Sequence, residues 1–138
     1  MKAQKKVILL DDEPIVCERL KPALEKVGFY VEAYTESQTA IDRLAQERFH
    51  VLVTDLKMQK PDGIDVLNFV KQQSPSTKVI IITGFATKDT AAEALESGAA
   101  DFIAKPFKIS HLLELIMKIT GAREEGQDES SQLDTTRG

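Results

Sequence analysis

Short apolar runs alternate with segments of helical periodicity along the chain, and no other feature of the sequence restricts the fold as much. The runs are KVILL at 6–10, YVEAY at 30–34, VLVT at 51–54, VIIIT at 79–83 and FIA at 102–104. Four of these five runs are continuously apolar, which is typical of strands covered on both faces. Strands that alternate with helices form parallel sheets with right-handed crossovers. The sequence therefore predicts an α/β fold, (βα)5, around a doubly wound five-stranded parallel sheet.

Apolar residues in the segments between the runs recur every three or four positions, which is the period of a helix with one buried face. The predicted helices cover 16–27, 40–45, 66–70, 90–97 and 109–116. Thr35 and Gln38 form a capping-box signal ahead of the second helix. The chain therefore consists of five β-α units, without an internal repeat.

Composition limits the domain organisation. The 138 residues are 42% hydrophobic, which is enough for one core, and we assign the folded domain to residues 1–120. Residues 121–138 hold five acidic and two basic side chains but one large apolar residue, so we expect a disordered acidic tail or linker. The net charge of −4 then leaves residues 1–120 nearly neutral. A nearly neutral domain lacks the basic face of a nucleic-acid binder.

The sequence also bears on the compartment. Cys17 is the single cysteine, so it cannot form an internal disulfide. The apolar run near the N-terminus is too short for a signal peptide or a membrane span, because acidic residues interrupt it at Asp11. We therefore expect a cytoplasmic protein without a membrane partner.

Carboxylates follow two of the predicted strands. Asp11, Asp12 and Glu13 come after the first strand, and Asp55 comes after the third. Open parallel sheets bind ligands at the carboxyl ends of their strands, so we expect these side chains to converge. Converging carboxylates repel one another unless a cation neutralises them, and Mg²⁺ prefers oxygen ligands. The sequence therefore predicts a Mg²⁺ site.

Thr83 and Lys105 follow the fourth and fifth strands, and a metal alone requires neither of them. An ammonium group, a hydroxyl group and Mg²⁺ around one carboxylate are the set that holds a tetrahedral anion attached to that carboxylate. Aspartate is a known covalent nucleophile in phosphoryl transfer. Asp55 is therefore the candidate phosphoryl acceptor.

Four motifs in the chain resemble the receiver domains of two-component response regulators, such as the chemotaxis regulators. They are LLDDEP, VTDLKM followed by DG, IIITG and GAADFIAKPF, spread in order across residues 6–108. The resemblance implies a flavodoxin-like sheet with strand order 2-1-3-4-5. It also implies a signalling switch that takes a phosphoryl group from a histidine kinase, a phosphotransfer protein or a small phosphodonor. Such a switch is not a conventional enzyme, since it only phosphorylates and dephosphorylates itself.

The resemblance assigns roles to the candidate residues. It implies that Asp11 and Asp12 belong to the acidic pair that binds Mg²⁺, with Asp12 the more direct ligand. Asp55 resembles the phosphorylated residue, which is also a metal ligand, and the backbone carbonyl of Lys57 would complete the coordination. Lys105 resembles the lysine that pairs with the phosphoryl oxygens.

Three further roles follow from the same resemblance. Thr83 matches the hydroxyl that moves toward the phosphoryl group, and Phe102 occupies the aromatic switch position. The peptide bond between Lys105 and Pro106 is expected to be cis, a state found almost only before proline. The face formed by the fourth predicted helix, the fifth strand and the fifth helix would then change, controlling a partner or output domain and offering a surface for a homodimer.

The chain departs from the family near the acceptor. Gln59 stands where many receivers have proline, and Pro61 comes two residues later, so we expect an unusual backbone in this loop. Lys57 and Phe85 flank the expected site. We expect these long or bulky side chains to hinder an attacking water and to lengthen the phosphorylated state.

Other functions remain open at this point. A haloacid-type phosphatase also uses an aspartate nucleophile and a metal, but it requires a second aspartate where this chain has Lys57. A flavodoxin-like flavin binder requires a hydroxyl- and glycine-rich loop after the first strand, whereas the acidic residues at 11–13 would repel its phosphate. The chain would be either a stand-alone receiver or the excised receiver of a longer DNA-binding regulator.

Overall fold

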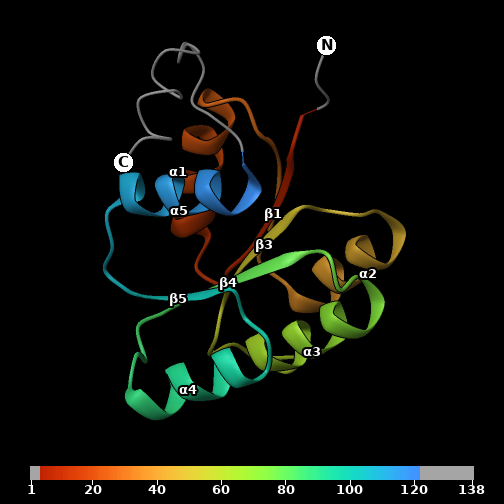
Figure 1. Cartoon of the computed structure of the whole chain (residues 1–138), viewed down its shortest axis with the longest axis vertical. Coiled ribbons are helices and arrows are strands. Elements are labelled where there is room, and N and C mark those ends of the chain that lie inside the picture. The colour runs from red at the N-terminus through yellow and green to blue at the C-terminus, as the bar shows by residue number, and fades with distance from the viewer. Residues whose placement is uncertain (1–3, 122–138) are drawn as a thin grey trace, which may run out of the picture.

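The computed structural model describes residues 4–121 of the chain, in which five strands and five helices alternate (Figure 1). The strands are β1 (Lys6–Leu10), β2 (Tyr30–Tyr34), β3 (Val51–Asp55), β4 (Lys78–Thr83) and β5 (Asp101–Ala104). The helices are α1 (Pro14–Lys26), α2 (Ser37–Gln46), α3 (Gly63–Gln73), α4 (Lys88–Glu96) and α5 (Ile109–Thr120). The acidic tail predicted at 121–138 lies outside the described residues, apart from Gly121, which ends α5.

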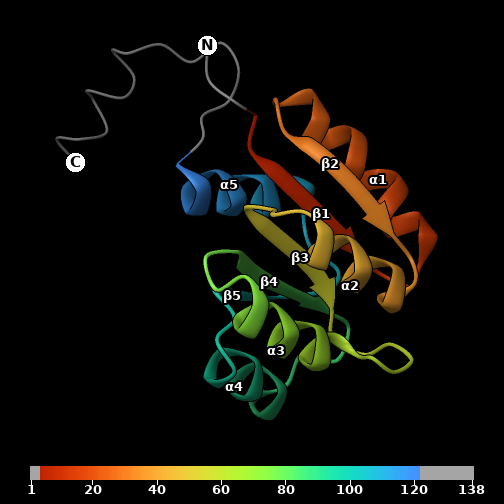
Figure 2. The same ribbon diagram turned by 90° about the vertical axis from the view of Figure 1, so that its right-hand side faces the viewer.

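The strands form one parallel sheet in the order β2-β1-β3-β4-β5, which confirms the predicted topology. Helices α1 and α5 lie on one face of this sheet, and α2, α3 and α4 lie on the other (Figure 2). The order of strands along the sheet reverses at β1, so the loops after β1 and β3 leave the sheet side by side and diverge toward opposite faces. This is the position at which open α/β sheets bind ligands.

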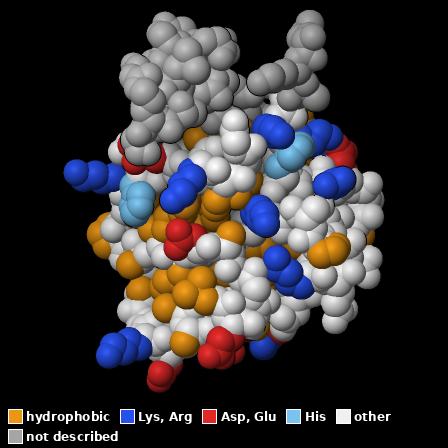
Figure 3. Space-filling view, viewed as in Figure 1, with side chains coloured by type: hydrophobic (Ala, Val, Ile, Leu, Met, Phe, Trp, Pro, Cys, Tyr) orange, Lys and Arg blue, Asp and Glu red, His pale blue; other side chains and the backbone are white. Residues whose placement is uncertain are grey.

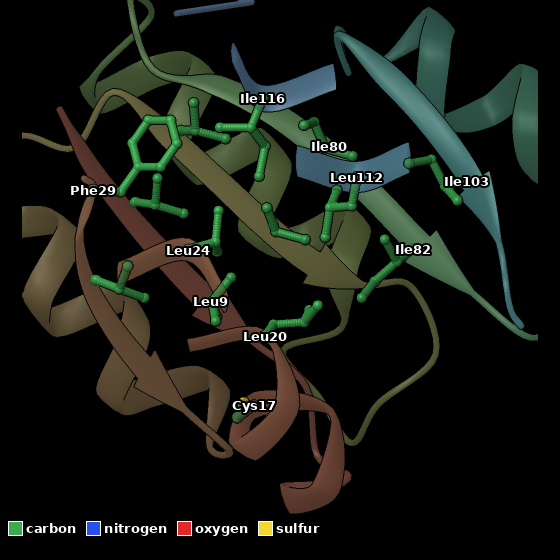
Figure 4. Close-up of a cluster of buried hydrophobic side chains, with 14 residues drawn as sticks. Leu9, Cys17, Leu20, Leu24, Phe29, Ile80, Ile82, Ile103, Leu112 and Ile116 are labelled. Carbon is green, nitrogen blue, oxygen red and sulfur yellow. The ribbon is translucent and has the colours of Figure 1, made fainter. Parts of the chain in front are cut away.

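Alternating side chains of the strands build two separate hydrophobic clusters, one on each face. Val7 and Leu9 of β1 contribute to the cluster under α1 and α5, whereas Ile8 and Leu10 contribute to the cluster under α2, α3 and α4. Figure 4 shows the first cluster, where Leu112 and Ile116 of α5 meet α1 and the sheet. Because both faces are covered, the central strands are rigid supports for the loops at their ends.

The helices differ in whether a side chain caps their N-terminus. Helix α3 begins with a capping box, in which Asp62 Oδ1 accepts from the Asp65 backbone N–H at 3.0 Å and Asp65 Oδ2 accepts from the Asp62 backbone N–H at 2.9 Å. The capping box predicted from Thr35 and Gln38 is wrong. Helix α2 begins at Ser37 after Glu36, and no side chain caps it. Within residues 4–121, none of the helices is long and apolar enough to span a membrane.

Edge strand β2 is tied to α2 through the carboxylate of Glu32. Arg43 donates from Nε and Nη2 at 2.8 and 2.7 Å, and the hydroxyl groups of Tyr34 and Tyr30 donate at 2.6 and 2.7 Å. The hydrogen bonds from Arg43, helped by those from the tyrosines and opposed by burial, lower the pKa of Glu32 from 4.5 to about 2. Each carboxylate oxygen thus accepts two hydrogen bonds, and the ionised form stabilises the fold.

We expect the substitution Glu32→Gln to lower the free energy of unfolding by about 2 kcal/mol near neutral pH, since hydrogen bonds to a charged group contribute about 1.5–3 kcal/mol. The folded-state pKa of Glu32 is below its ordinary value, so this stabilisation is fully present above pH 4.5 and is lost as the pH falls toward 2. Urea unfolding followed by circular dichroism, at about pH 7 and about pH 3, measures the difference between the variant and the wild type.

The matched control is Glu25→Gln, because Glu25 pairs with Lys21 at 2.9 Å on the exposed face of α1. This control should change the free energy of unfolding by no more than about 0.5 kcal/mol. An equal cost of Glu32→Gln at both pH values would show that shape, and not charge, explains the role of Glu32.

Candidate functional site

Three carboxylates meet at the carboxyl edge of the sheet. Asp11 and Asp12 follow β1, and Asp55 is the last residue of the adjacent strand β3. One carboxylate oxygen of each lies within 4.8 Å of the other two. Asp11 and Asp55 are buried, whereas Asp12 is exposed. The structure therefore brings together the acidic residues that the sequence predicted to converge.

Asp55 is held in one orientation by its own loop. Its Oδ1 accepts from the backbone N–H of Leu56 at 2.7 Å, and its Oδ2 lies 3.4 Å from Lys105 Nζ. Burial and the neighbouring charge of Asp11 raise the pKa of the Asp55 carboxyl, while Lys105 and the Leu56 N–H lower it in part. The ionised form of Asp55 is therefore less stable here than that of an aspartate in water. Added positive charge would favour it.

Lys105 reaches into the acidic group from the end of β5. Its ammonium group lies 2.7 Å from Asp11 Oδ2, 2.9 Å from Glu13 Oε1 and 3.4 Å from Asp55 Oδ2. Burial acts to lower the pKa of Lys105, but the hydrogen bonds from its ammonium group to Asp11 and Glu13 outweigh burial and raise it. Lys105 therefore carries a permanent positive charge at the centre of the site.

Thr83 is the last residue of β4, where it pairs with Ala104 of β5, and it is fully buried. Its hydroxyl oxygen accepts from the backbone N–H of Phe85 at 3.0 Å. The side chain of Phe85 is 62% exposed, and Lys57 is also exposed. Both residues lie in loops that follow the strands ending at Asp55 and Thr83. Among these residues, Thr83 is the buried hydroxyl and Phe85 and Lys57 form the outer surface.

Phe102 and Pro106 lie on either side of Lys105. Phe102 is half-buried on β5 and packs against the cluster under α2, α3 and α4. The peptide bond between Lys105 and Pro106 is cis, which is the geometry that the resemblance implied. Phe102 and Pro106 therefore flank Lys105, one on β5 and the other in the segment that connects β5 to α5.

The sequence motifs do not indicate three features of this site. Glu13 is an acidic residue after β1, and no motif indicates its contact with Lys105. The peptide bond between Lys60 and Pro61 is cis, in the loop where an unusual backbone was expected. Gly63 approaches the acceptor strand so closely that an added Cβ would lie 2.3 Å from the backbone oxygen of Asp55. The DG pair after the acceptor was the available signal for this last contact.

The donor set of the site fits a hard divalent cation. Carboxylate oxygens are the ligands that Mg²⁺ and Ca²⁺ take, and the exposed position of Asp12 leaves room for water ligands on its side. Three carboxylates face a single ammonium group that contacts two of them, so negative charge is in excess. The acidic pocket can therefore hold a metal ion.

Comparison with known proteins agrees with this geometry. Residues 7–117 match the family model described as the response regulator receiver domain. The chain belongs to this family. A receiver domain of two-component response regulators explains the strand order and the cluster at its edge together. The assignment does not favour the phosphatase alternative.

Relatives of this receiver domain include longer regulators. It is 32% identical over 114 residues to the response regulator protein PilR of Pseudomonas aeruginosa PAO1, covering 83% of this chain and 26% of PilR. It is also 32% identical to the DNA-binding transcriptional regulator NtrC of Proteus hauseri, covering 91% of this chain and 27% of NtrC. The chain thus spans about a quarter of the length of these curated relatives.

Solved receiver structures superpose closely on the chain. A CheY-like receiver domain protein from Methanospirillum hungatei JF-1 gives a TM-score of 0.81 at 27% identity, over 86% of this chain and 96% of that one. The beryllofluoride-activated NtrC4 receiver domain dimer gives a TM-score of 0.79 at 33% identity, over 84% of this chain and 96% of that one. Both similarities extend over nearly the whole of the neighbouring chains.

Proposed function

We propose that this receiver domain is a phosphoryl-accepting switch in which Asp55 is the acceptor and Mg²⁺ is the metal. The observation that carries the proposal is the position of Asp55. It is a buried carboxylate at the end of β3, with Lys105 3.4 Å away and two further carboxylates close by. The proposed donor is a histidine kinase or a phosphotransfer protein, and the exchange takes place in the cytoplasm.

In the forward reaction, a carboxylate oxygen of Asp55 attacks the phosphorus of the donor. A new P–O bond forms, and the bond from phosphorus to the donor nitrogen or oxygen breaks with its electron pair on the donor. When bound by Asp11, Asp12, Asp55 and the carbonyl of Lys57, Mg²⁺ would neutralise charge on the phosphoryl oxygens. Lys105, which follows β5, neutralises further charge on these oxygens. Hydrolysis reverses the modification, since water attacks phosphorus and releases phosphate and the free carboxylate of Asp55.

The switch begins at Thr83. Its hydroxyl, which accepts from the Phe85 N–H in the structure, turns to donate to a phosphoryl oxygen. Phe102 then turns from its half-buried position into the space near Thr83, which changes the face formed by α4, β5 and α5. A phosphoryl group biases such a two-state element through its interactions with one state, and a shift of a few kcal/mol is enough.

Phe85 and Lys57 set the lifetime of the phosphorylated state in this proposal. Both are exposed at the entrance to the site, where an attacking water must approach.

The output follows from the α4-β5-α5 face. Figure 3 shows apolar side chains gathered over this face, between α4 and α5. Leu95 of α4 is a large apolar residue that is 50% exposed. A second copy of this chain, or an output domain, would bind this face.

The acceptor is tested by labelling with acetyl phosphate and Mg²⁺, followed by intact mass spectrometry. The wild type should gain the mass of one phosphoryl group, and both Asp55→Ala and addition of a chelator should remove the gain. The matched control is Asp42→Asn, which should label like the wild type. Asp42 is an exposed residue of α2 whose carboxylate accepts a hydrogen bond from Gln38. An undiminished adduct on Asp55→Ala would rule out Asp55 as the acceptor.

The lifetime is tested by the substitution Phe85→Ala. Removing the ring should increase the rate of dephosphorylation about three- to tenfold, which corresponds to a barrier lower by about 1 kcal/mol. The rate is measured from the loss of the phosphoryl adduct after the donor is removed. Phe85→Leu keeps most of the bulk and should remain close to the wild type. If Phe85→Ala decays at the wild-type rate, the ring does not hinder water.

Dimerisation through the α4-β5-α5 face is tested by sedimentation with Mg²⁺ and the phosphoryl analogue BeF₃⁻. The analogue should shift the wild type toward a dimer, and Leu95→Glu should weaken this dimer at least about tenfold, because a charge would be buried at the interface. Ala45→Glu is the matched control, since Ala45 is exposed on α2, which packs against β1 and β2 at the opposite edge of the sheet from β5. Equal effects of the two variants, or a monomer throughout, would refute this interface.

A further inference from the structure

We propose that Glu13 is a positioning residue that holds the Lys105 ammonium group away from Asp55. A phosphoryl group on Asp55 must then compete with Glu13 for Lys105. The inference rests on the proposed function of Asp55 and adds a residue that sets how readily the switch takes its phosphorylated form. Neither the motifs of the sequence nor the family match assigns a role to this side chain.

The distances around Lys105 Nζ carry the inference. The ammonium group lies 2.7 Å from Asp11 Oδ2 and 2.9 Å from Glu13 Oε1, which are hydrogen-bond distances for charged partners. The contact with Asp55 Oδ2 is 3.4 Å and is the longest of the three. Lys105 is therefore drawn toward the β1 side of the site, and its contact with the acceptor is the weakest.

The side chain of Glu13 forms no hydrogen bond with the start of α1. Glu13 is the residue that precedes α1, where a side-chain oxygen commonly caps the free N–H groups of the helix. No side-chain cap is formed, and the carboxylate extends to Lys105 instead. Pro14 at the first helical position fixes the backbone beside it. The ion pair, and not the cap, determines the orientation of this carboxylate.

Glu13, Asp11 and Lys105 form a closed ring of hydrogen bonds. The Glu13 backbone N–H donates to Asp11 Oδ1 at 2.9 Å, and Asp11 Oδ2 accepts from Lys105 at 2.7 Å. Lys105 completes the ring by donating to Glu13 Oε1 at 2.9 Å. Asp11 is buried, whereas the Glu13 side chain is 60% exposed. Glu13 is thus the member of the ring that can be exchanged at low cost.

A phosphoryl group on Asp55 adds charged oxygens that compete for the same ammonium group. An exposed ion pair resists that competition by about 0.2–1 kcal/mol, so its removal should favour the phosphoryl group by about one and a half- to fivefold. The test is the affinity for BeF₃⁻ in the presence of Mg²⁺, measured by nuclear magnetic resonance titration. Glu13→Gln should bind BeF₃⁻ tighter than the wild type by this factor.

A change in net charge would also favour an anion, so the control must separate the two effects. Glu36 is an exposed glutamate that shares a surface hollow with Asp12, yet it has no contact with Lys105. Glu36→Gln removes the same charge and should leave the affinity for BeF₃⁻ close to that of the wild type. The same gain in both variants would overturn the proposal.

Lys105→Met completes a double-mutant cycle. If Glu13 acts through Lys105, then Glu13→Gln should no longer increase the affinity for BeF₃⁻ in the Lys105→Met background. Urea unfolding of the same four proteins in chelator gives a second readout without metal or analogue, and it should show favourable coupling between Glu13 and Lys105. A gain that persists without Lys105, or an absence of coupling, would overturn the proposal.

The outcomes also separate this inference from the proposed function. If the wild type fails to bind BeF₃⁻ and fails to label with acetyl phosphate, the function of Asp55 is wrong. If the wild type binds and labels but Glu13→Gln has the same affinity as the wild type, only the role of Glu13 is wrong. Glu13→Ala provides a second variant with the same expected gain.

Discussion

Lys105 lies among three carboxylates that would otherwise repel one another at the end of a parallel sheet, and the arrangement of the site depends on this balance of charge. Asp11 and Asp55 are buried, so their repulsion is screened less than it would be in water. The ammonium group offsets part of that repulsion but not all of it, as the raised pKa of Asp55 indicates. A site with residual negative charge and oxygen ligands favours a cation, and a cation in turn favours a phosphoryl group.

The sheet holds the residues of the site in fixed positions. β1 and β3 are adjacent, and both are covered by helices, so the residues after them start from fixed positions. The two hydrophobic clusters lie on opposite faces and meet only through the strands. Lys105 comes from β5 at the edge and must cross β4 and β3 to reach Asp11. The long side chain of Lys105 makes this contact possible.

Much of the fold could be predicted because the strands are buried on both faces. Each predicted strand differs from the observed one by at most one residue at an end, since continuous apolar runs have clear limits. Helix ends depend on local capping and are harder to predict than strand ends. The signal at Thr35 failed because the helix begins two residues later, after Glu36, where no side chain caps it. Pairing between neighbouring strands does not depend on such details.

The candidate site could also be predicted in part from the sequence. The strands β3 and β4 end at Asp55 and Thr83, and the strands β1 and β5 are followed by Asp11, Asp12 and Lys105, so the topology alone predicts that these residues meet. Glu13 could not be assigned, because an exposed glutamate at a helix start has several equally common uses. The contact of Glu13 with Lys105 depends on the position of the Lys105 ammonium group, which comes from another strand. Contacts of this kind depend on three-dimensional distances, which neither spacing nor periodicity contains.

Gly63 has a consequence for how this protein can change over time. Its backbone N–H donates to the Leu56 carbonyl at 3.0 Å, and its α-carbon lies against the backbone of Asp55 and Leu56. The loop between Leu56 and Gly63 is therefore a closed ring of fixed length. A substitution at an exposed position within the loop, such as Gln59, leaves this closure in place, whereas any side chain at position 63 would push against the backbone of the acceptor.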